Sequence, residues 1–126
     1  MLSNATPIAT VAVRDLDAAR AFYEGTLGLA LAEGHQEPGT ATYRAGGAPL
    51  LVYPSDFAGT NRATAVTWDV GEGIAALVAE LRGRGVAFLH YDMPGSRLDG
   101  DLHVSDPMKI AWFADPDGNI HALVGA

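Results

Sequence analysis

The sequence predicts an α+β fold built from two βαβββ modules, paired into a concave mixed sheet with the helices outside. A β-prone run, an amphipathic helix pattern and three short β-prone runs follow one another, and the same order then starts again. Residues 13–29, shifted by 57 positions, fall on residues 70–86, so that Asp15 meets Glu72 and Gly28 meets Gly85. The open alternative is that any two amphipathic helices ending in glycine align this well.

The first module is expected at residues 8–54. Asp15 is predicted to cap a helix over residues 16–26, because its carboxylate can accept hydrogen bonds from first-turn N–H groups, and Gly28 ends that helix. Its strands are expected at residues 8–13, 30–35, 40–45 and 49–53.

The second module is expected at residues 63–125, with a helix over residues 72–84 that Gly85 ends. Its strands are expected at residues 63–69, 86–91, 108–114 and 120–124. Neither module can close a core alone, so the two should pair into one domain over residues 1–126.

The segment between residues 91 and 108 is predicted to lack regular structure. A connection of more than about 12–15 such residues is uncommon in a compact domain and is often a functional lid. Arg97 and His103 would be its groups that reach a ligand from above, and a plain mobile surface loop is the alternative.

Composition excludes several functions. The net charge of −7 comes without a Lys/Arg cluster, so neither nucleic acid nor an anionic membrane is an expected partner. The chain contains no cysteine, which excludes disulfides and thiolate chemistry. The start of the chain has no signal-peptide pattern and no apolar run reaches about 18 residues, so a cytoplasmic protein is expected.

Near the C-terminus, two apolar runs flank the turn formers Asp115-Pro116-Asp117-Gly118-Asn119, which predicts a β-hairpin. This turn, together with Val11-Ala12-Val13-Arg14-Asp15-Leu16, Ala21-Phe22-Tyr23 and Leu27-Gly28-Leu29, resembles the vicinal oxygen chelate superfamily. That superfamily includes glyoxalase I, bleomycin-resistance proteins and extradiol dioxygenases. The resemblance spans residues 8–124 and implies the paired βαβββ fold.

Metal-dependent members of that superfamily bind a divalent ion through His, Gln or Glu side chains on four strands. The matching positions here are Ile8, Leu51, Ala65 and Ala122. An aliphatic side chain has no electron pair to donate, so we expect neither a metal nor another cofactor. A slip of one residue would bring His121 to the position of Ala122, but alternation along the strand predicts that His121 faces the other way.

The other histidines do not predict a new metal site. His35, His90, His103 and His121 are scattered, and only His90-Tyr91-Asp92 places a histidine and a carboxylate close together. Scattered histidines are usually surface or structural groups.

Alternation from the four former ligand positions predicts an apolar and aromatic cavity with a few hydroxyl groups. Trp112 is expected opposite Ala122, whereas Trp68 should face the helices. The candidate ligand-binding residues are Thr10, Tyr43, Leu51, Tyr53, Thr67, Tyr91, His103 and Trp112. Catalytic residues are not identifiable.

Three functions remain open. The first is metal-free binding of a small, partly aromatic or apolar molecule, by resemblance to the bleomycin-resistance branch. The second is a metal-independent enzyme that uses Tyr53, Tyr91, His90 or His103 as acid–base groups, and the third, less favoured, is a metal-dependent lyase or dioxygenase. The resemblance also implies a homodimer.

Overall fold

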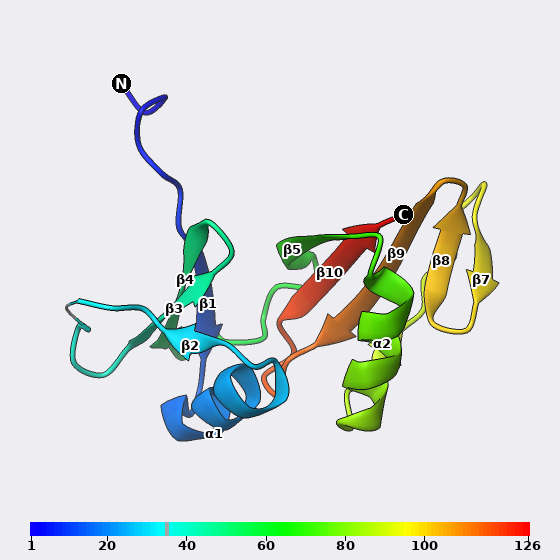
Figure 1. Ribbon diagram of the computed structural model, residues 1–126. Helices are drawn as coiled ribbons and strands as arrows, with labels where there is room; N and C mark the ends of the chain where they lie inside the picture. Colours follow the sequence, from blue (N-terminus) through cyan, green and yellow to red (C-terminus); the bar gives the residue numbers. More distant parts are fainter. Residues whose placement is uncertain (35) are drawn as a thin grey trace. The chain divides into compact units, whose positions relative to one another are not determined.

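The computed structural model describes residues 1–34 and 36–126, which form two compact units, Met1–Asn61 and Arg62–Ala126 (Figure 1). Each unit is a mixed β-sheet with helical structure on one face, so the predicted α+β class is confirmed. His35, the last residue of the strand predicted over residues 30–35, lies outside the described residues. Among the residues described, no helix is long and apolar enough to cross a bilayer.

The first unit contains four strands in the order β1-β4-β3-β2. Strand β1 pairs with β4 in parallel, and the other neighbours are antiparallel. Its elements are β1 (Ala9–Val13), α1 (Leu16–Arg20), η1 (Ala21–Thr26), β2 (Ala30–Leu31), β3 (Ala41–Ala45) and β4 (Ala48–Pro54). The second predicted strand is therefore much shorter than expected.

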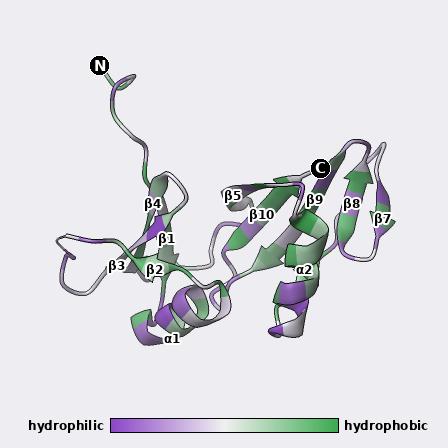
Figure 2. Cartoon of the chain, viewed as in Figure 1, coloured by the Kyte–Doolittle hydropathy of each residue, from purple (hydrophilic) through white to green (hydrophobic). Residues whose placement is uncertain are grey.

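The predicted helix forms, but it changes type halfway. The Asp15 carboxylate accepts hydrogen bonds from the amides of Asp17 and Ala18, at 2.9 and 3.3 Å, as an N-cap does. From Ala21 onward the helix is a π-helix, which ends with the Leu27 amide donating to the carbonyl of Phe22. In Figure 2 both α-helices carry hydrophobic and hydrophilic residues side by side, as amphipathic helices do.

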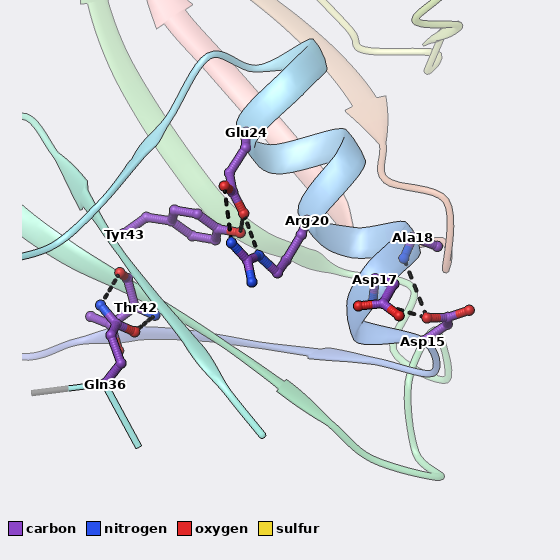
Figure 3. A network of polar contacts seen from close by, with 8 residues as sticks. All are labelled: Asp15, Asp17, Ala18, Arg20, Glu24, Gln36, Thr42 and Tyr43. Carbon is purple, nitrogen blue, oxygen red and sulfur yellow. Dashed lines mark hydrogen bonds and ion pairs between the residues drawn. The ribbon is translucent and has the colours of Figure 1, made fainter. Parts of the chain in front are cut away.

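The prediction that Tyr43 lines the ligand cavity is wrong. Tyr43 is fully buried on the helix side of the sheet, where its ring stacks on Tyr23 at 6.1 Å between centroids. Its hydroxyl donates to Glu24 at 2.9 Å, and Arg20 holds the same carboxylate (Figure 3). The hydrogen bond from Arg20 lowers the pKa of Glu24, and burial raises the pKa of Tyr43. The phenol thus has a partner inside the unit, which a core tyrosine needs.

The second unit repeats this arrangement and adds to it. Strand β5 pairs with β10 in parallel, and the sheet order is β5-β10-β9-β8-β7, with β6 also on β9. Helix α2 packs against β10 (Figure 1). The elements are β5 (Thr64–Gly71), α2 (Ile74–Gly83), β6 (Phe88–Leu89), β7 (Arg97–Asp99), β8 (Leu102–Ser105), β9 (Met108–Ala114) and β10 (Ile120–Gly125).

The segment expected to lack structure contains a β-hairpin, so that prediction is wrong. Strands β7 and β8 pair around Gly100, and β8 adds to the edge of β9. Leu102 and Val104 are buried, which explains why the hairpin stays on the sheet. Arg97, expected to reach a ligand, is exposed on β7 and lies 3.6 Å from Asp106.

The β9–β10 turn is held by one buried carboxylate. Asp115 accepts hydrogen bonds from the amides of Asp117 and Asn119, at 2.9 and 2.8 Å, and from the Asn119 side chain at 2.8 Å. The Asp115 amide donates to the Asn119 carbonyl, which closes the hairpin. The predicted hairpin is confirmed, and its turn sets the register of β9 against β10.

Replacing Asp115 with Ala should lower the unfolding free energy by about 2–4 kcal/mol, because two amides and a side-chain amide lose a charged acceptor. Urea denaturation followed by circular dichroism measures the change. Asp99→Ala, on exposed β7, is the control and should stay within about 0.5 kcal/mol of the parent. Equal stabilities of the two variants would contradict this role for the carboxylate.

Gly125 allows close approach of β10 to Gly71, since a Cβ at Gly125 would lie 2.1 Å from the Gly71 carbonyl oxygen. Gly125→Ala should therefore destabilise the fold by about 1–3 kcal/mol. The matched control is Gly83→Ala in α2, where a Cβ meets nothing within 4 Å and should stabilise the helix by up to about 1 kcal/mol. Thermal melts should show a lower melting temperature for Gly125→Ala and an equal or higher one for Gly83→Ala. An unchanged melting temperature for Gly125→Ala would refute the clash.

Candidate functional site

The candidate site residues lie on the face of each sheet that is opposite the helix, which we call the open face. In the first unit, Thr10 lies opposite Leu51, and the next open-face pair along is Ala12 with Tyr53. Their neighbours Val11, Leu50 and Val52 are buried on the helix side, whereas Tyr53 is 37% exposed. Thr10, Leu51 and Tyr53 therefore share the open face, as the alternation predicts.

In the second unit, the strand register places side chains in rows across β5, β10 and β9. One row contains Thr67, Ala122 and Trp112, so the predicted position of Trp112 opposite Ala122 is confirmed. The adjacent row contains Val66, His121 and Phe113, all of them buried. Adjacent rows point to opposite faces, so the first row lies on the open face.

His121 lies on the helix side, as predicted, and is part of the core. Its ring stacks on Phe113 at 4.9 Å with an interplanar angle of 5°, and its Nδ1 accepts a hydrogen bond from the Trp68 indole at 2.9 Å. Trp68 thus also faces the helix side. Burial lowers the pKa of His121 to about 4, with a smaller opposing effect of Asp115, so the imidazole is neutral at pH 7.

Three rings form a cluster on the open face, which we call the Trp112 cluster: Tyr91, His103 and Trp112. The Trp112 ring meets His103 edge to face at 4.7 Å and Tyr91 at 5.0 Å between centroids. Tyr91 is exposed, whereas His103 is only 2% exposed. Strand β8 supplies His103 and β9 supplies Trp112, so the unexpected hairpin completes the cluster.

His103 does not reach a ligand from a loop, contrary to the prediction. Its Nε2 accepts a hydrogen bond from the Tyr91 amide at 3.0 Å, and its Nδ1 lies 3.3 Å from the Ile110 carbonyl oxygen. Both ring nitrogens are therefore used within the unit. Its role is to hold Tyr91 beside Trp112.

A cavity of about 400 Å³ opens next to Tyr91. This volume lies within the usual range for small-molecule sites. The lining side chains combine apolar, hydroxyl, acidic and imidazole groups: His90, Tyr91, Asp92, Met93, Ser96 and Leu98.

Sequence reasoning missed the partner of His90. The nearby carboxylate in the sequence is Asp92, but the ring pairs with Asp101, eleven residues on, at 2.7 Å from Nε2 to Oδ1. Arg82 of α2 donates to the other oxygen of Asp101 at 2.8 Å from Nε. The hydrogen bonds from His90 and Arg82 lower the pKa of Asp101. The β7–β8 turn brings these groups together, and the Asp99-Gly100 pair is the local signal that could have marked that turn.

The positions that match the metal ligands of the superfamily supply no donor atoms. Ile8 directly precedes β1, Leu51 is on β4, Ala65 is on β5 and Ala122 is on β10. Within residues 1–34 and 36–126, no three His, Asp or Glu side chains lie close enough together to hold a metal ion. The residues present therefore do not fit a metal at those positions.

Each unit runs from a strand through a helix into a mixed sheet, and in each the first and last strands pair in parallel, as the resemblance to the superfamily implies. A model of the Glyoxalase/Bleomycin resistance protein/Dioxygenase superfamily matches residues 6–123, and the chain belongs to this superfamily. No curated protein is significantly similar to it in sequence.

Solved structures share the fold at low identity. TnmS3, an antibiotic binding protein from Streptomyces sp. CB03234, is 23% identical with a TM-score of 0.68, covering 99% of this chain and 98% of its own. A glyoxalase/bleomycin resistance protein/dioxygenase from Alicyclobacillus acidocaldarius is 22% identical, TM-score 0.70, covering 97% and 91%. The fosfomycin resistance protein FosX from Listeria monocytogenes, complexed with Mn(II) and sulfate, is 16% identical, TM-score 0.70, covering 100% and 92%.

The buried His121 should make the fold sensitive to acid. Its pKa is lower in the folded than in the unfolded chain, so the unfolded chain binds more protons as the pH falls from about 6.5 to about 4. The fold should lose about 3 kcal/mol across this window through His121 alone. Urea denaturation at several pH values measures the loss.

The comparison variant is His121→Phe, which keeps a ring in the stack but cannot titrate. At neutral pH it should be less stable than the parent, because the Trp68 indole loses its acceptor. The gap between the two proteins should then shrink as the solution is acidified. A gap that is independent of pH would mean that His121 is not buried in its neutral form.

Proposed function

We propose that this protein binds a small, partly aromatic or apolar molecule, without a metal, on the open face of the second unit. The observation that carries the proposal is the Trp112 cluster, whose exposed ring Tyr91 lines a cavity of about 400 Å³. Aromatic rings supply a large contact area and edge-to-face geometry for a flat ligand. The ligand would pack on Tyr91 and Trp112, with His103 supporting Tyr91 and with Thr67 on the same face, two strands from Trp112.

The open face of the first unit offers a second surface of the same kind. Thr10, Leu51 and Tyr53 present two hydroxyl groups and apolar area there. We propose these three residues as further ligand contacts. TnmS3, an antibiotic binding protein with the same fold, is a precedent for a binding function.

The chemistry of the four aliphatic positions supports metal-free binding. At the positions where metal-dependent members present ligands, Ile8 and Leu51 in the first unit and Ala65 in the second present apolar side chains, and Ala122 is buried. A polar or charged side chain at one of these positions would lose its water on ligand binding and would have to form hydrogen bonds with the ligand instead. An apolar side chain favours burial of an apolar ligand. A homodimer and a cytoplasmic location stay predictions.

An enzyme that uses acid–base groups is the second candidate. His103 does not suit it, because both ring nitrogens already have partners. His90 and Tyr91 do line the cavity, and His90 is held by Asp101. The presence of His90 and Tyr91 in one cavity favours an acid–base enzyme, and a pH–rate profile for any turnover would test this function.

Trp112→Ala should weaken ligand binding at least tenfold, because an aromatic anchor loses its whole contact area. The test is native mass spectrometry of tag-free protein for a co-purified molecule, followed by a thermal-shift screen with that molecule. The control is Phe57→Ala, which removes an aromatic ring that is 77% exposed in the first unit.

Circular dichroism should show that both variants fold. Chelator treatment should leave ligand binding unchanged, and elemental analysis should find no stoichiometric metal. Equal binding by the two variants would refute the Trp112 cluster as the site. Loss of binding after chelation would instead establish a metal-dependent protein.

A further inference from the structure

Asp101 connects α2 to the cavity through its two carboxylate oxygens. Arg82 donates to one oxygen, and His90 Nε2 lies 2.7 Å from the other. The Asp101 side chain is largely shielded from solvent, so neither interaction is a fully exposed ion pair. The hydrogen bonds from His90 and Arg82 lower the pKa of Asp101, so the carboxylate is ionised and can accept a hydrogen bond from His90.

This contact decides which nitrogen of His90 is basic. In the neutral ring, the proton on Nε2 is donated to Asp101, and Nδ1 is the nitrogen with a free electron pair. The His90 side chain is 46% exposed and lines the cavity beside Tyr91. A bound molecule can therefore donate a hydrogen bond to a histidine that is already oriented and electrostatically supported.

The rest of the lining limits the kind of molecule. Tyr91, Met93 and Leu98 provide apolar area for a flat ring. Asp92 is the charged carboxylate among the lining residues and would repel a ligand that arrives as an anion. A neutral hydroxyl group avoids that repulsion and still has a proton to donate.

We propose that this cavity is a subsite for a planar aromatic molecule with an acidic hydroxyl group, which donates its hydrogen bond to Nδ1 of His90. The inference rests on the proposed binding function and names the chemical class of its ligand.

The test compares 4-nitrophenol with nitrobenzene, which has the same ring and nitro group but no hydroxyl. Calorimetric titration of the parent protein should show at least about tenfold tighter binding of 4-nitrophenol, the effect of one hydrogen bond to a charge-supported acceptor. The titration is run at a pH below the ionisation of free 4-nitrophenol, so that the neutral hydroxyl form is the one that binds.

His90→Phe should abolish the preference for 4-nitrophenol and leave nitrobenzene binding in place. Asp101→Asn should reduce the preference while His90 is retained. Asp92→Asn is the matched control from the same cavity wall, and the preference should persist because His90 and Asp101 are unchanged. Circular dichroism checks that each variant folds.

The outcomes separate this inference from the binding function. Equal affinity for the two probes, no binding of 4-nitrophenol, or a preference that survives His90→Phe would overturn the subsite. Tighter binding of benzoate than of 4-nitrophenol would also overturn it, by showing an anion site. The proposed binding function is tested separately by Trp112→Ala. If this variant weakens binding of every probe that the parent protein binds, the binding function stands even where the subsite is overturned.

Discussion

The hydrogen bonds to the Asp115 carboxylate are the constraint on which the second unit depends. They fix the turn between β9 and β10, and a turn fixes the register of the two strands that it joins. In that register Ala122 lies opposite Trp112, and His121 lies opposite Phe113. A slip of one residue would expose the imidazole and bury the indole of Trp112 among the wrong neighbours. One polar side chain in a loop therefore decides which aromatic groups form the core and which form a surface.

In both units, a polar ring on the helix side of the sheet is buried with a hydrogen-bond partner. His121 is tolerated in the core because it is neutral, stacked on Phe113 and accepts the Trp68 indole proton. Tyr43 is tolerated in the core of the first unit because its hydroxyl reaches Glu24. His121 and Tyr43 each have a hydrogen-bond partner on the helix side, as burial requires. The open faces are left with hydroxyl groups, small residues and the Trp112 cluster, which can exchange water for a ligand.

Local chemistry made much of the fold predictable. The Asp15 cap, the Asp115–Asn119 turn and the opposite directions of Trp112 and His121 follow from residues close together in sequence. The side of Tyr43 did not follow, because it depends on the register of β3 against β4, which pairs Tyr43 with the buried Leu50. The β7–β8 hairpin was hidden by flanking Asp, Gly and Pro residues that resemble a loop, and its stability comes from pairing with β9. For the same reason the His90–Asp101 contact could not be anticipated.

The β7–β8 hairpin also distinguishes the second unit from the first. In the described part of the first unit, the connection from β2 to β3 contains no strands, whereas the corresponding part of the second unit contains β7 and β8. That insertion supplies His103, which holds Tyr91, and Asp101, which orients His90. The positions where metal-dependent relatives carry ligands are aliphatic here. Under the proposed function, the polar contacts to a ligand therefore come from the β7–β8 hairpin and the strand end that it supports, a segment without a counterpart in the described part of the first unit.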